Sequence, residues 1–339
     1  MQLTLVVPGL LDFAQAEPAR GDAQGDALAR LLATGVPAAA HDGATAVACA
    51  ALGIAKQRDW PVAPLLASAA NLDPGNAFWL LAEPVMLVVG QQDVQLAAVV
   101  DDLSADEAME LLTTFNAHFA GDGLHFFAAT PARWLIAATA TQELVTHPAD
   151  DALGAPIFPF LPGGPDAARW RRWQSEMQML LFSHPVTAKR EHEGRAEVNG
   201  VWLSGGGVRA DVPATPHIAS VYADAALQRD LARACGLAAA PAPSSFTAWI
   251  DAGPRSPSLV WLQEFEANDG SAALAALTRD WADPLRAALD AHAIDALDVV
   301  LSGRGRAAWF TPRPRSLIGR WRARLAAARL STLLAAAGR

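Results

Sequence analysis

The chain begins MQLTLVVPGLLD (residues 1–12), and its run from Leu3 to Val7 is continuously apolar up to Pro8-Gly9. A short β-type apolar run that ends at a turn pair predicts a buried strand. Alanine-rich helical patterns follow around residues 26–33, 44–53 and 62–70. The chain therefore starts as an α/β fold would, with a strand followed by helices.

The same alternation returns in the last third of the chain. Ile218–Tyr222 predicts a strand, and Asp224 the cap of a helix that buries Leu227 and Leu231 and stops at Gly236. The further expected elements are strands near 245–250 and 259–263, helices within 271–292, and a hairpin of strands 298–301 and 307–310 closed by residues 302–306. Alternation at both ends predicts that the two ends build one wound sheet.

The middle of the chain has a different pattern. Short apolar runs separated by turn residues predict a largely antiparallel sheet, with runs at 78–81, 85–89, 95–100, 124–128 and 133–138. Ser104-Ala105-Asp106-Glu107 is a capping box that predicts a helix ending before Gly121. The proline- and glycine-rich residues 148–165 predict a linker.

A helix capped by Asp166 follows this predicted linker. Its expected buried stripe consists of Trp170, Trp173, Met177 and Leu180. A strand over 198–203 then runs into Gly205-Gly206-Gly207, which by default is a tight turn after a strand.

The expected fold class is α/β, with a wound mixed sheet as the core and an inserted α+β lobe. The core is predicted over residues 1–72 and 166–339, including a helical return at 166–195, and the lobe over 75–160. This division predicts that Leu3–Val7, Val201–Leu203 and Ile218–Tyr222 share one sheet.

Composition excludes several classes of protein. With 339 residues, 52% hydrophobic and 18% charged, the chain has enough apolar residues for a core and is far from disordered compositions. No basic stretch precedes the short apolar run at the N-terminus, so neither a signal peptide nor a membrane span is expected there. Two cysteines, Cys49 and Cys235, cannot form a disulfide framework. A cytoplasmic location is the expectation.

Charge is divided unevenly along the chain. Nine of the 26 basic residues follow Asp298 and none of the 35 acidic residues does, so an acidic body precedes a basic tail. An acidic body argues against nucleic-acid binding. Residues 313–339 predict a basic amphipathic helix with Leu317, Ile318, Trp321, Leu325 and Ala328 on one face. Four arginines flank this face: Arg320, Arg322, Arg324 and Arg329.

Two hypotheses fit this tail. Its apolar face could dock on the acidic body of the same chain, which is the default. Alternatively, the helix could bind an anionic membrane surface or an acidic partner.

Common catalytic motifs do not occur. No Lys-Ser/Thr follows the triple glycine, which excludes a Walker loop. The eight histidines lack metal-ligand spacing, and no GxSxG elbow is present. His184 precedes Pro185 after the tryptophan-rich helix, and His192 lies in a charged stretch that predicts a solvated loop.

Several stretches resemble the RpfE-type regulatory protein family of proteobacteria. They are DWPVAPL (59–65), NAFWLLAEPVML (76–87), the helix LSADEAMELLTTFNAHF (103–119) and SHPVTAKREHEGRAEVNGVWLSGGG (183–207). The layout is also similar to archaeal-type, cofactor-independent phosphoglycerate mutases of the alkaline phosphatase superfamily. The most specific link is the segment from His184-Pro185-Val186 to Gly207. The resemblance implies an alkaline-phosphatase-like or phosphoglycerate-mutase-like core.

The resemblance also implies that the catalytic positions are empty. Where those mutases have a first metal-binding Asp after strand one, this chain has Pro8, with Asp12 four residues later. Their nucleophilic Ser corresponds to Ala44, next to Thr45. Their metal-binding Asp and His after a late strand correspond to the segment that contains Glu264, Glu266 and Asp269. This segment has no histidine. Their final Asp-His pair corresponds to Ser302-Gly303.

The expected function is therefore a non-catalytic regulatory or binding protein, with no cofactor and no bound metal. Its candidate ligand-binding residues are Asp12, His184, Gly205, Gly206, Gly207 and Glu264. The first alternative is a metal-dependent, mutase-like phosphotransfer enzyme with displaced ligands. The second is a peripheral membrane or protein adaptor that acts through the arginine-flanked tail.

Overall fold

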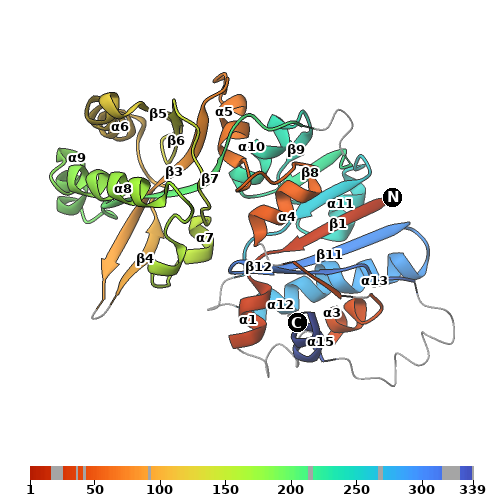
Figure 1. The fold of residues 1–339 in the computed structure, drawn as a ribbon. Coiled ribbons are helices and arrows are strands. Elements are labelled where there is room, and N and C mark those ends of the chain that lie inside the picture. Colours follow the sequence, from red (N-terminus) through yellow and green to blue (C-terminus); the bar gives the residue numbers. More distant parts are fainter. Residues whose placement is uncertain are drawn as a thin grey trace. The chain divides into compact units, whose positions relative to one another are not determined.

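The computed structural model describes residues 1–16, 26–35, 37–40, 43–90, 93–212, 217–265, 270–314 and 329–337. The chain divides into two compact units (Figure 1). We call Met1–Gly53 with Pro213–Arg339 the terminal unit, and Ile54–Val212 the middle unit.

The terminal unit is built on a seven-stranded sheet. Its strand order is β2 (Pro37–Ala40), β12 (Arg306–Phe310), β11 (Ala296–Gly303), β1 (Gln2–Val7), β10 (Ser258–Trp261), β8 (Ser220–Ala223) and β9 (Ala238–Ala240). β1 pairs in parallel with both β10 and β11, and β12 is antiparallel to its two neighbours. Both ends of the chain therefore build one sheet, as predicted.

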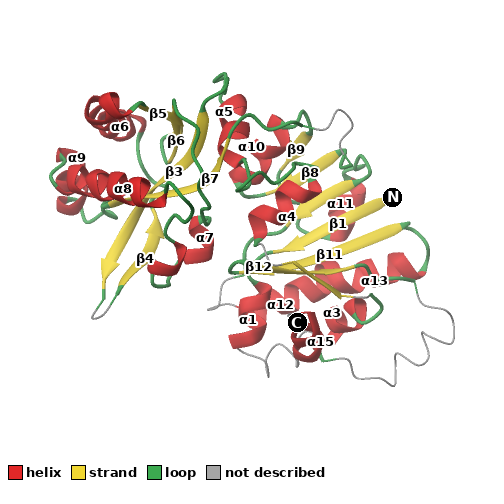
Figure 2. Ribbon diagram, in the orientation of Figure 1, coloured by secondary structure: helices red, strands yellow, loops and turns green. Residues whose placement is uncertain are grey.

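Helices cover this sheet on both sides (Figure 2). α1 (Leu10–Ala16), α3 (Asp26–Leu32), α12 (Gly270–Leu277), α13 (Asp283–Asp290) and α15 (Leu330–Ala337) pack on the side to which Leu3, Leu5 and Val7 point. α4 (Ala44–Ala51) lies on the opposite side. The remaining elements of this unit are α10 (Ala226–Ala234), α11 (Phe246–Asp251) and the π-helical turn η4 (Thr278–Ala282).

Two local predictions in the terminal unit were wrong. Residues 245–250 form helix α11 instead of a strand, because Ser245 caps the helix and Phe246 and Trp249, three residues apart, both enter the core. The expected helix cap at Asp224 is also wrong, since the N-cap residue of α10 is Ala225. The β11–β12 hairpin, by contrast, forms where it was predicted.

The middle unit contains a five-stranded antiparallel sheet. β4 (Val94–Val99), β3 (Phe78–Val89), β6 (Arg133–Ala138) and β5 (Leu124–Thr130) follow one another, and β7 (Gly200–Gly207) pairs with β3. Its helices are α5 (Val62–Ala69), α6 (Ala105–Phe119), α7 (Ala149–Ala152), α8 (Ala167–Phe182) and α9 (Pro185–His192), with short 3₁₀ turns η1 (Ala120–Asp122) and η2 (Phe158–Phe160). The capping box between Ser104 and Glu107 is confirmed.

The pairing of β7 with β3 corrects the predicted domain division. Val201–Leu203 was expected in the same sheet as Leu3–Val7, but these residues pair with Ala82–Pro84 in the middle unit. All eight residues of β7 are buried, so the strand belongs to the core of that unit. Residues 54–72 and 166–212 therefore join the lobe expected over 75–160.

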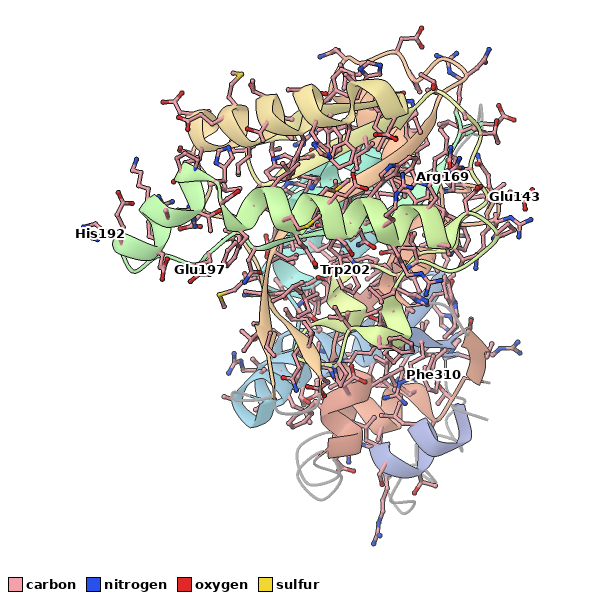
Figure 3. All side chains as sticks on the ribbon, turned by 60° about the vertical axis from the view of Figure 1, so that its left-hand side comes forward. Glu143, Arg169, His192, Glu197, Trp202 and Phe310 are labelled. Atoms are coloured by element: carbon pink, nitrogen blue, oxygen red, sulfur yellow. The ribbon has the colours of Figure 1, made fainter. Side chains whose placement is uncertain are left out.

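Two further segments of the middle unit differ from expectation. Residues 148–165 are not a linker, because Gly154 and Ala155 bond to Leu96 and Ile157 bonds to Val94 along the edge of β4. In α8, Leu181 is buried where Leu180 was expected, next to Trp170, Trp173 and Met177. At the N-terminal end of α8, Arg169 approaches the segment that contains Glu143, and bonds to Gln142 (Figure 3).

Three amide side chains pair with single backbone residues of the middle sheet. Gln57 bonds both the N–H and the C=O of Val208, Asn116 those of Phe126, and Asn199 those of Leu87, at 2.7–3.1 Å. Phe126 and Leu87 each pair with a neighbouring strand at Ile136 and Leu96, and the amide bonds their backbone groups in place of a second strand; Val208 directly follows β7.

The expected helix over 313–339 falls largely outside the described residues, which include neither Arg320, Arg322, Arg324 nor the Leu317–Ala328 face. Arg329 is described and immediately precedes α15. Leu330 and Leu334 of α15 are buried in the core of the terminal unit. Among the helices of the described segments, none is long and apolar enough to cross a bilayer.

Candidate functional site

The carboxyl ends of the parallel strands gather most of the predicted site positions at one edge of the terminal sheet. β1 ends before Pro8, β10 before the segment 262–265, and β8 before Asp224. Ser302 and Gly303 end β11 at the same edge. Open α/β sheets bind ligands outside the carboxyl ends of their strands, so this edge is the candidate site.

The topology also brings the start of α4 to this edge. Ala40 of β2 pairs with Ala307, which pairs with Ser302, and Gly43 then caps the helix that begins Ala44-Thr45. The positions Pro8, Ala44, Thr45, Ser302 and Gly303, which the resemblance singled out, therefore all follow strand ends at this edge. Glu266 and Asp269 lie outside the described residues.

The carboxylate of Asp12 is held by the β11–β12 hairpin. Arg306 Nη2 donates to its Oδ1 at 2.7 Å, and the backbone N–H of Arg304 donates to its Oδ2 at 2.9 Å. A Cβ on Gly303 would lie 2.6 Å from Asp12 Oδ1, so only glycine leaves room for this carboxylate. Asp12 and Gly303 thus lie in direct contact although they are 291 positions apart in sequence.

The turn after β1 packs directly on the segment after β10. The N–H of Phe265 donates to the carbonyl of Pro8 at 3.0 Å, and Gly9 adopts a φ of +75°. A Cβ on Gly9 would lie 2.7 Å from the Phe265 carbonyl oxygen. Glycine is required here both by the left-handed backbone and by this close approach.

A pocket of about 560 Å³ opens beside this turn, and we call it the edge pocket. Its polar lining includes Asp224, Gln263, Glu264 and Asp280, and Leu277 and Trp281 are among its apolar walls. Asp280 and Trp281 come from the π-helical turn η4, a distortion that often marks functional sites. Arg279 binds both oxygens of Asp280 at 2.7–2.8 Å and lowers the pKa of that carboxyl.

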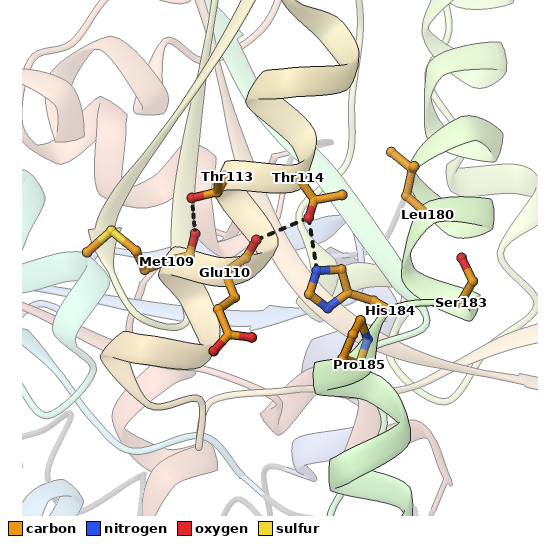
Figure 4. Close-up of a pocket in the computed structure, with 8 residues that line it drawn as sticks. All are labelled: Met109, Glu110, Thr113, Thr114, Leu180, Ser183, His184 and Pro185. Atoms are coloured by element: carbon orange, nitrogen blue, oxygen red, sulfur yellow. Dashed lines mark hydrogen bonds between the residues drawn. The ribbon is translucent and has the colours of Figure 1, made fainter.

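His184 lies in the middle unit, in a shallow groove of about 550 Å³ between α6 and the start of α9 (Figure 4). The N–H of Val186 donates to Nδ1 at 3.2 Å, so this nitrogen carries no hydrogen. Nε2 therefore donates to the Thr114 hydroxyl at 3.0 Å, and that hydroxyl donates to the Glu110 carbonyl. Nδ1 thus caps α9 and Nε2 joins this cap to α6, which assigns His184 a structural role.

Burial lowers the pKa of His184, although the Glu110 carboxylate acts in the opposite direction. A histidine with a lowered folded pKa contributes stability above its unfolded pKa of about 6.5 and loses that contribution as the pH falls. We expect His184→Asn, which keeps a capping acceptor, to remove this acid sensitivity. His184→Ala should lose about 1 kcal/mol at neutral pH, as a removed cap does.

Urea unfolding at several pH values between neutrality and mild acid checks this expectation. His192→Asn is the matched control, because His192 is exposed at the end of α9 (Figure 3). An unchanged pH profile in His184→Asn would contradict the assigned tautomer and its role.

The three glycines of β7 accommodate packing, and the expected turn is absent. They are buried inside the strand, where the register with β3 shifts and Gly205 has a φ of +63°. A Cβ added to Gly205 would lie 2.8 Å from Val62. One on Gly206 would lie 2.9 Å from Phe78, and one on Gly207 would lie 2.7 Å from Pro61. These positions are filled by the protein itself, so they leave no space for a ligand.

Asp59 explains why DWPVAPL and the triple glycine occur together. Its carboxylate, 7% exposed, accepts bonds from the backbone N–H of Trp60 and Thr146 and from the Thr146 hydroxyl. Burial raises the pKa of Asp59, and a bond from the Gly206 backbone is among the opposing effects. Both motifs thus serve the architecture of the middle unit.

Sequence patterns did not indicate the role of Arg306, nor that of Asp280 and Trp281. Arg306 looked like part of the basic tail, and only the hairpin geometry places it on Asp12. The described residues contain no group of three or more His, Cys, Asp or Glu side chains placed to hold a metal ion.

Comparisons with known proteins show a distant similarity. A stretch of 107 residues is 30% identical to the 2,3-bisphosphoglycerate-independent phosphoglycerate mutase of Methanosarcina mazei and 29% identical to that of Methanosarcina barkeri. It covers 31% of this chain and only 27% of either relative. No family model matches the chain.

Among solved structures, a cofactor-independent phosphoglycerate mutase from Thermoplasma acidophilum aligns with a TM-score of 0.44 at 14% identity. That alignment covers 92% of this chain and 89% of the other. A protein from Pyrococcus horikoshii aligns with a TM-score of 0.47 at 12% identity, covering 92% and 87%.

Proposed function

We propose that this chain is a non-catalytic regulatory or binding protein on a phosphoglycerate-mutase-like scaffold. The scaffold is supported by the 107-residue similarity to phosphoglycerate mutases. The regulatory role is supported by the four stretches that resemble the RpfE-type family.

The main support for a non-catalytic role is the ion pair between Asp12 and Arg306. Asp12 is the carboxylate nearest in sequence to the first metal position, and a metal would have to displace the arginine and the Arg304 N–H from it. Metal-assisted phosphoryl transfer needs an oxygen nucleophile beside a charged cluster. Pro8, Ala44 and Gly303 supply neither oxygen nor imidazole side chains at the corresponding positions.

The test combines metal analysis with a mutase assay. We expect elemental analysis of the full-length protein, after equilibration with manganese or zinc, to find no stoichiometric metal. Phosphorus NMR should find no interconversion of phosphoglycerates, with the Methanosarcina mazei mutase as positive control. Manganese-dependent activity that disappears in Thr45→Ala and Asp12→Asn would overturn the proposal and restore the enzyme with displaced ligands.

The arginine-flanked tail supports a second candidate function, binding to an anionic surface or acidic partner. The observation in its favour is the nine basic and zero acidic residues after Asp298. Truncation is a poor test, because Leu330 and Leu334 belong to the core. We expect the triple variant Arg320→Gln, Arg322→Gln, Arg324→Gln to lose at least tenfold in binding to phosphatidylserine vesicles at low salt, where each basic residue contributes about 1 kcal/mol. Equal binding by the wild-type and triple-variant proteins would exclude the tail as the binding element.

A further inference from the structure

Glu83 places a carboxyl group among apolar side chains of the middle sheet. Side chains two residues apart on a strand point to the same face, so Glu83 shares a face with Leu81 and Val85. Its neighbour on β7 is Trp202, which is 3% exposed. Leu81 and Val85 are buried as well, and Glu83 is half-buried between them. The hydration of this carboxyl group therefore depends on what covers this face of the sheet.

The short helix α7 lies over this carboxyl group. Ala149 and Ala152 of α7 form one buried cluster with Trp202. Burial raises the pKa of Glu83, and Asp150, which lies between the two alanines in sequence, raises it further as a nearby like charge. Closure of α7 thus removes water from Glu83 and places a second carboxylate beside it.

Hydrogen bonds attach α7 to the sheet at both of its ends. Before the helix, the carbonyl of His147 accepts from the Trp202 indole N–H at 2.7 Å. After the helix, the N–H groups of Gly154 and Ile157 donate to carbonyls of β4 at 2.7 Å and 2.9 Å. We call residues 147–157 the α7 strap. Because the strap uses backbone groups on the edge of β4, opening the strap would free that edge.

We infer that the α7 strap is a pH-sensitive cover of the middle sheet, held closed while Glu83 is protonated and opened more readily when Glu83 is ionised. An ionised Glu83 gains hydration and loses the repulsion from Asp150 when the strap opens. Protonation is therefore easier in the closed state than in the open state. Closure is favoured at low pH and loses this contribution as the pH rises to about 7. Access to the edge of β4 thus depends on pH.

The other titratable groups around Glu83 come from the elements packed against this part of β3. β4, β7 and α5 contain none, and α6 and α8 pack on the opposite face of the sheet. The remaining groups are Asp150 and Asp151 on α7, Arg133 on β6, and His147 and Asp59 in the segments before α7 and α5. Of these, Asp150 raises the pKa of Glu83 and Arg133 lowers it. Asp150 is therefore the second residue to change in a test.

Hydrogen exchange of the full-length protein, followed by mass spectrometry, tests the inference. After correction for the intrinsic exchange rate, we expect the protection of the Gly154 and Ile157 amides to fall about ten- to thirtyfold between about pH 5.5 and about pH 8. Glu83→Gln should keep its protection across this range, and Asp150→Asn should lose less protection than the wild-type protein. At about pH 8 the strap amides should be about tenfold or more less protected than the amide of Phe126, because they exchange through local opening.

Glu143→Gln is the matched control, since it removes an exposed carboxylate just before the strap and should keep the wild-type pH dependence. Constant protection of the wild-type strap, or a fall in Glu83→Gln as large as in the wild-type protein, would overturn the inference. Equal protection of the strap amides and the Phe126 amide would also overturn it, because exchange would then require unfolding of the whole unit. These measurements involve neither metal nor turnover, so their outcome is distinct from that of the manganese and mutase measurements.

Discussion

Replacing Arg190 by methionine should lower the free energy of unfolding of the middle unit by about 3–5 kcal/mol, the cost of breaking a buried ion pair from one side. The Arg190 side chain is fully buried, and its guanidinium binds Asp102 and also Glu107, the latter at 3.2 Å. Its Nε donates to the Ala196 carbonyl at 2.8 Å. Methionine fills part of the volume but leaves Glu107, whose side chain is 7% exposed, without this partner.

Arg195 offers a matched control because it binds the same two carboxylates from a more exposed position. Its side chain is 32% exposed, with bonds to Glu107 at 2.9 Å and Asp102 at 3.3 Å. We expect Arg195→Met to cost about 1 kcal/mol or less, as pairs near solvent do. Urea unfolding followed by tryptophan fluorescence measures both variants. If both variants lowered the free energy of unfolding by the same amount, burial of Arg190 would not be the cause of the large loss.

The second large effect concerns Glu83 in the centre of β3. Burial raises the pKa of Glu83 to about 7, with a further increase from the Asp150 carboxylate and an opposing effect from Arg133. A carboxyl whose folded pKa lies above its unfolded value favours folding when protonated. Its contribution is fully present below about pH 4.5 and is lost as the pH rises to about 7.

Glu83→Gln should therefore stabilise the middle unit in a pH-dependent way. The side chain is half-buried, so we expect a gain of about 2–3 kcal/mol at pH 8 and almost none below pH 4.5, since one pKa unit corresponds to about 1.4 kcal/mol. Urea unfolding across this range gives the measurement. Glu191→Gln, on the exposed face of α9, is the control and should show no such trend. If the free energy of unfolding rose by the same amount at every pH, the cause would be better packing of the glutamine side chain and not removal of the Glu83 charge.

The two pH effects in the middle unit have opposite signs. His184 loses its contribution as the pH falls, whereas Glu83 loses its contribution as the pH rises. The two pH windows overlap between about pH 4.5 and 6.5, so the two effects partly offset each other there in the wild-type protein. Each single variant should therefore show the pH dependence of the remaining group more steeply than the wild-type protein does.

Elements that depend on neighbouring residues were predictable from sequence. β1 follows from an apolar run closed by Pro8-Gly9, the β11–β12 hairpin from two short runs around a glycine turn, and α6 from its capping box. In each case the physical cause lies within a few residues: a turn, a cap or a periodic apolar face. The α/β class and the joining of both chain ends in one sheet follow from the same local signals.

Pairing between distant segments was not predictable in this way. β7 could have joined either sheet, since a fully buried strand shows no exposed face from which its neighbours can be inferred. The α11 segment has the composition of a strand and becomes a helix because Phe246 and Trp249 both reach the core. Three consecutive glycines resemble a ligand-binding loop until Val62, Phe78 and Pro61 are seen to occupy the space.

The candidate site shows the same limit most clearly. The strand-end positions Pro8 and Gly303 and the helix start at Ala44 were named from the sequence through the family resemblance, and the convergence of strand ends in an α/β fold explains why they lie at one edge. Tertiary structure decided that Asp12 is bound to Arg306, 294 residues away, and that Asp224, Glu264 and Trp281 line one pocket. Electrostatic and packing contacts of this kind depend on which segments meet after folding, and no local pattern of residues encodes that meeting.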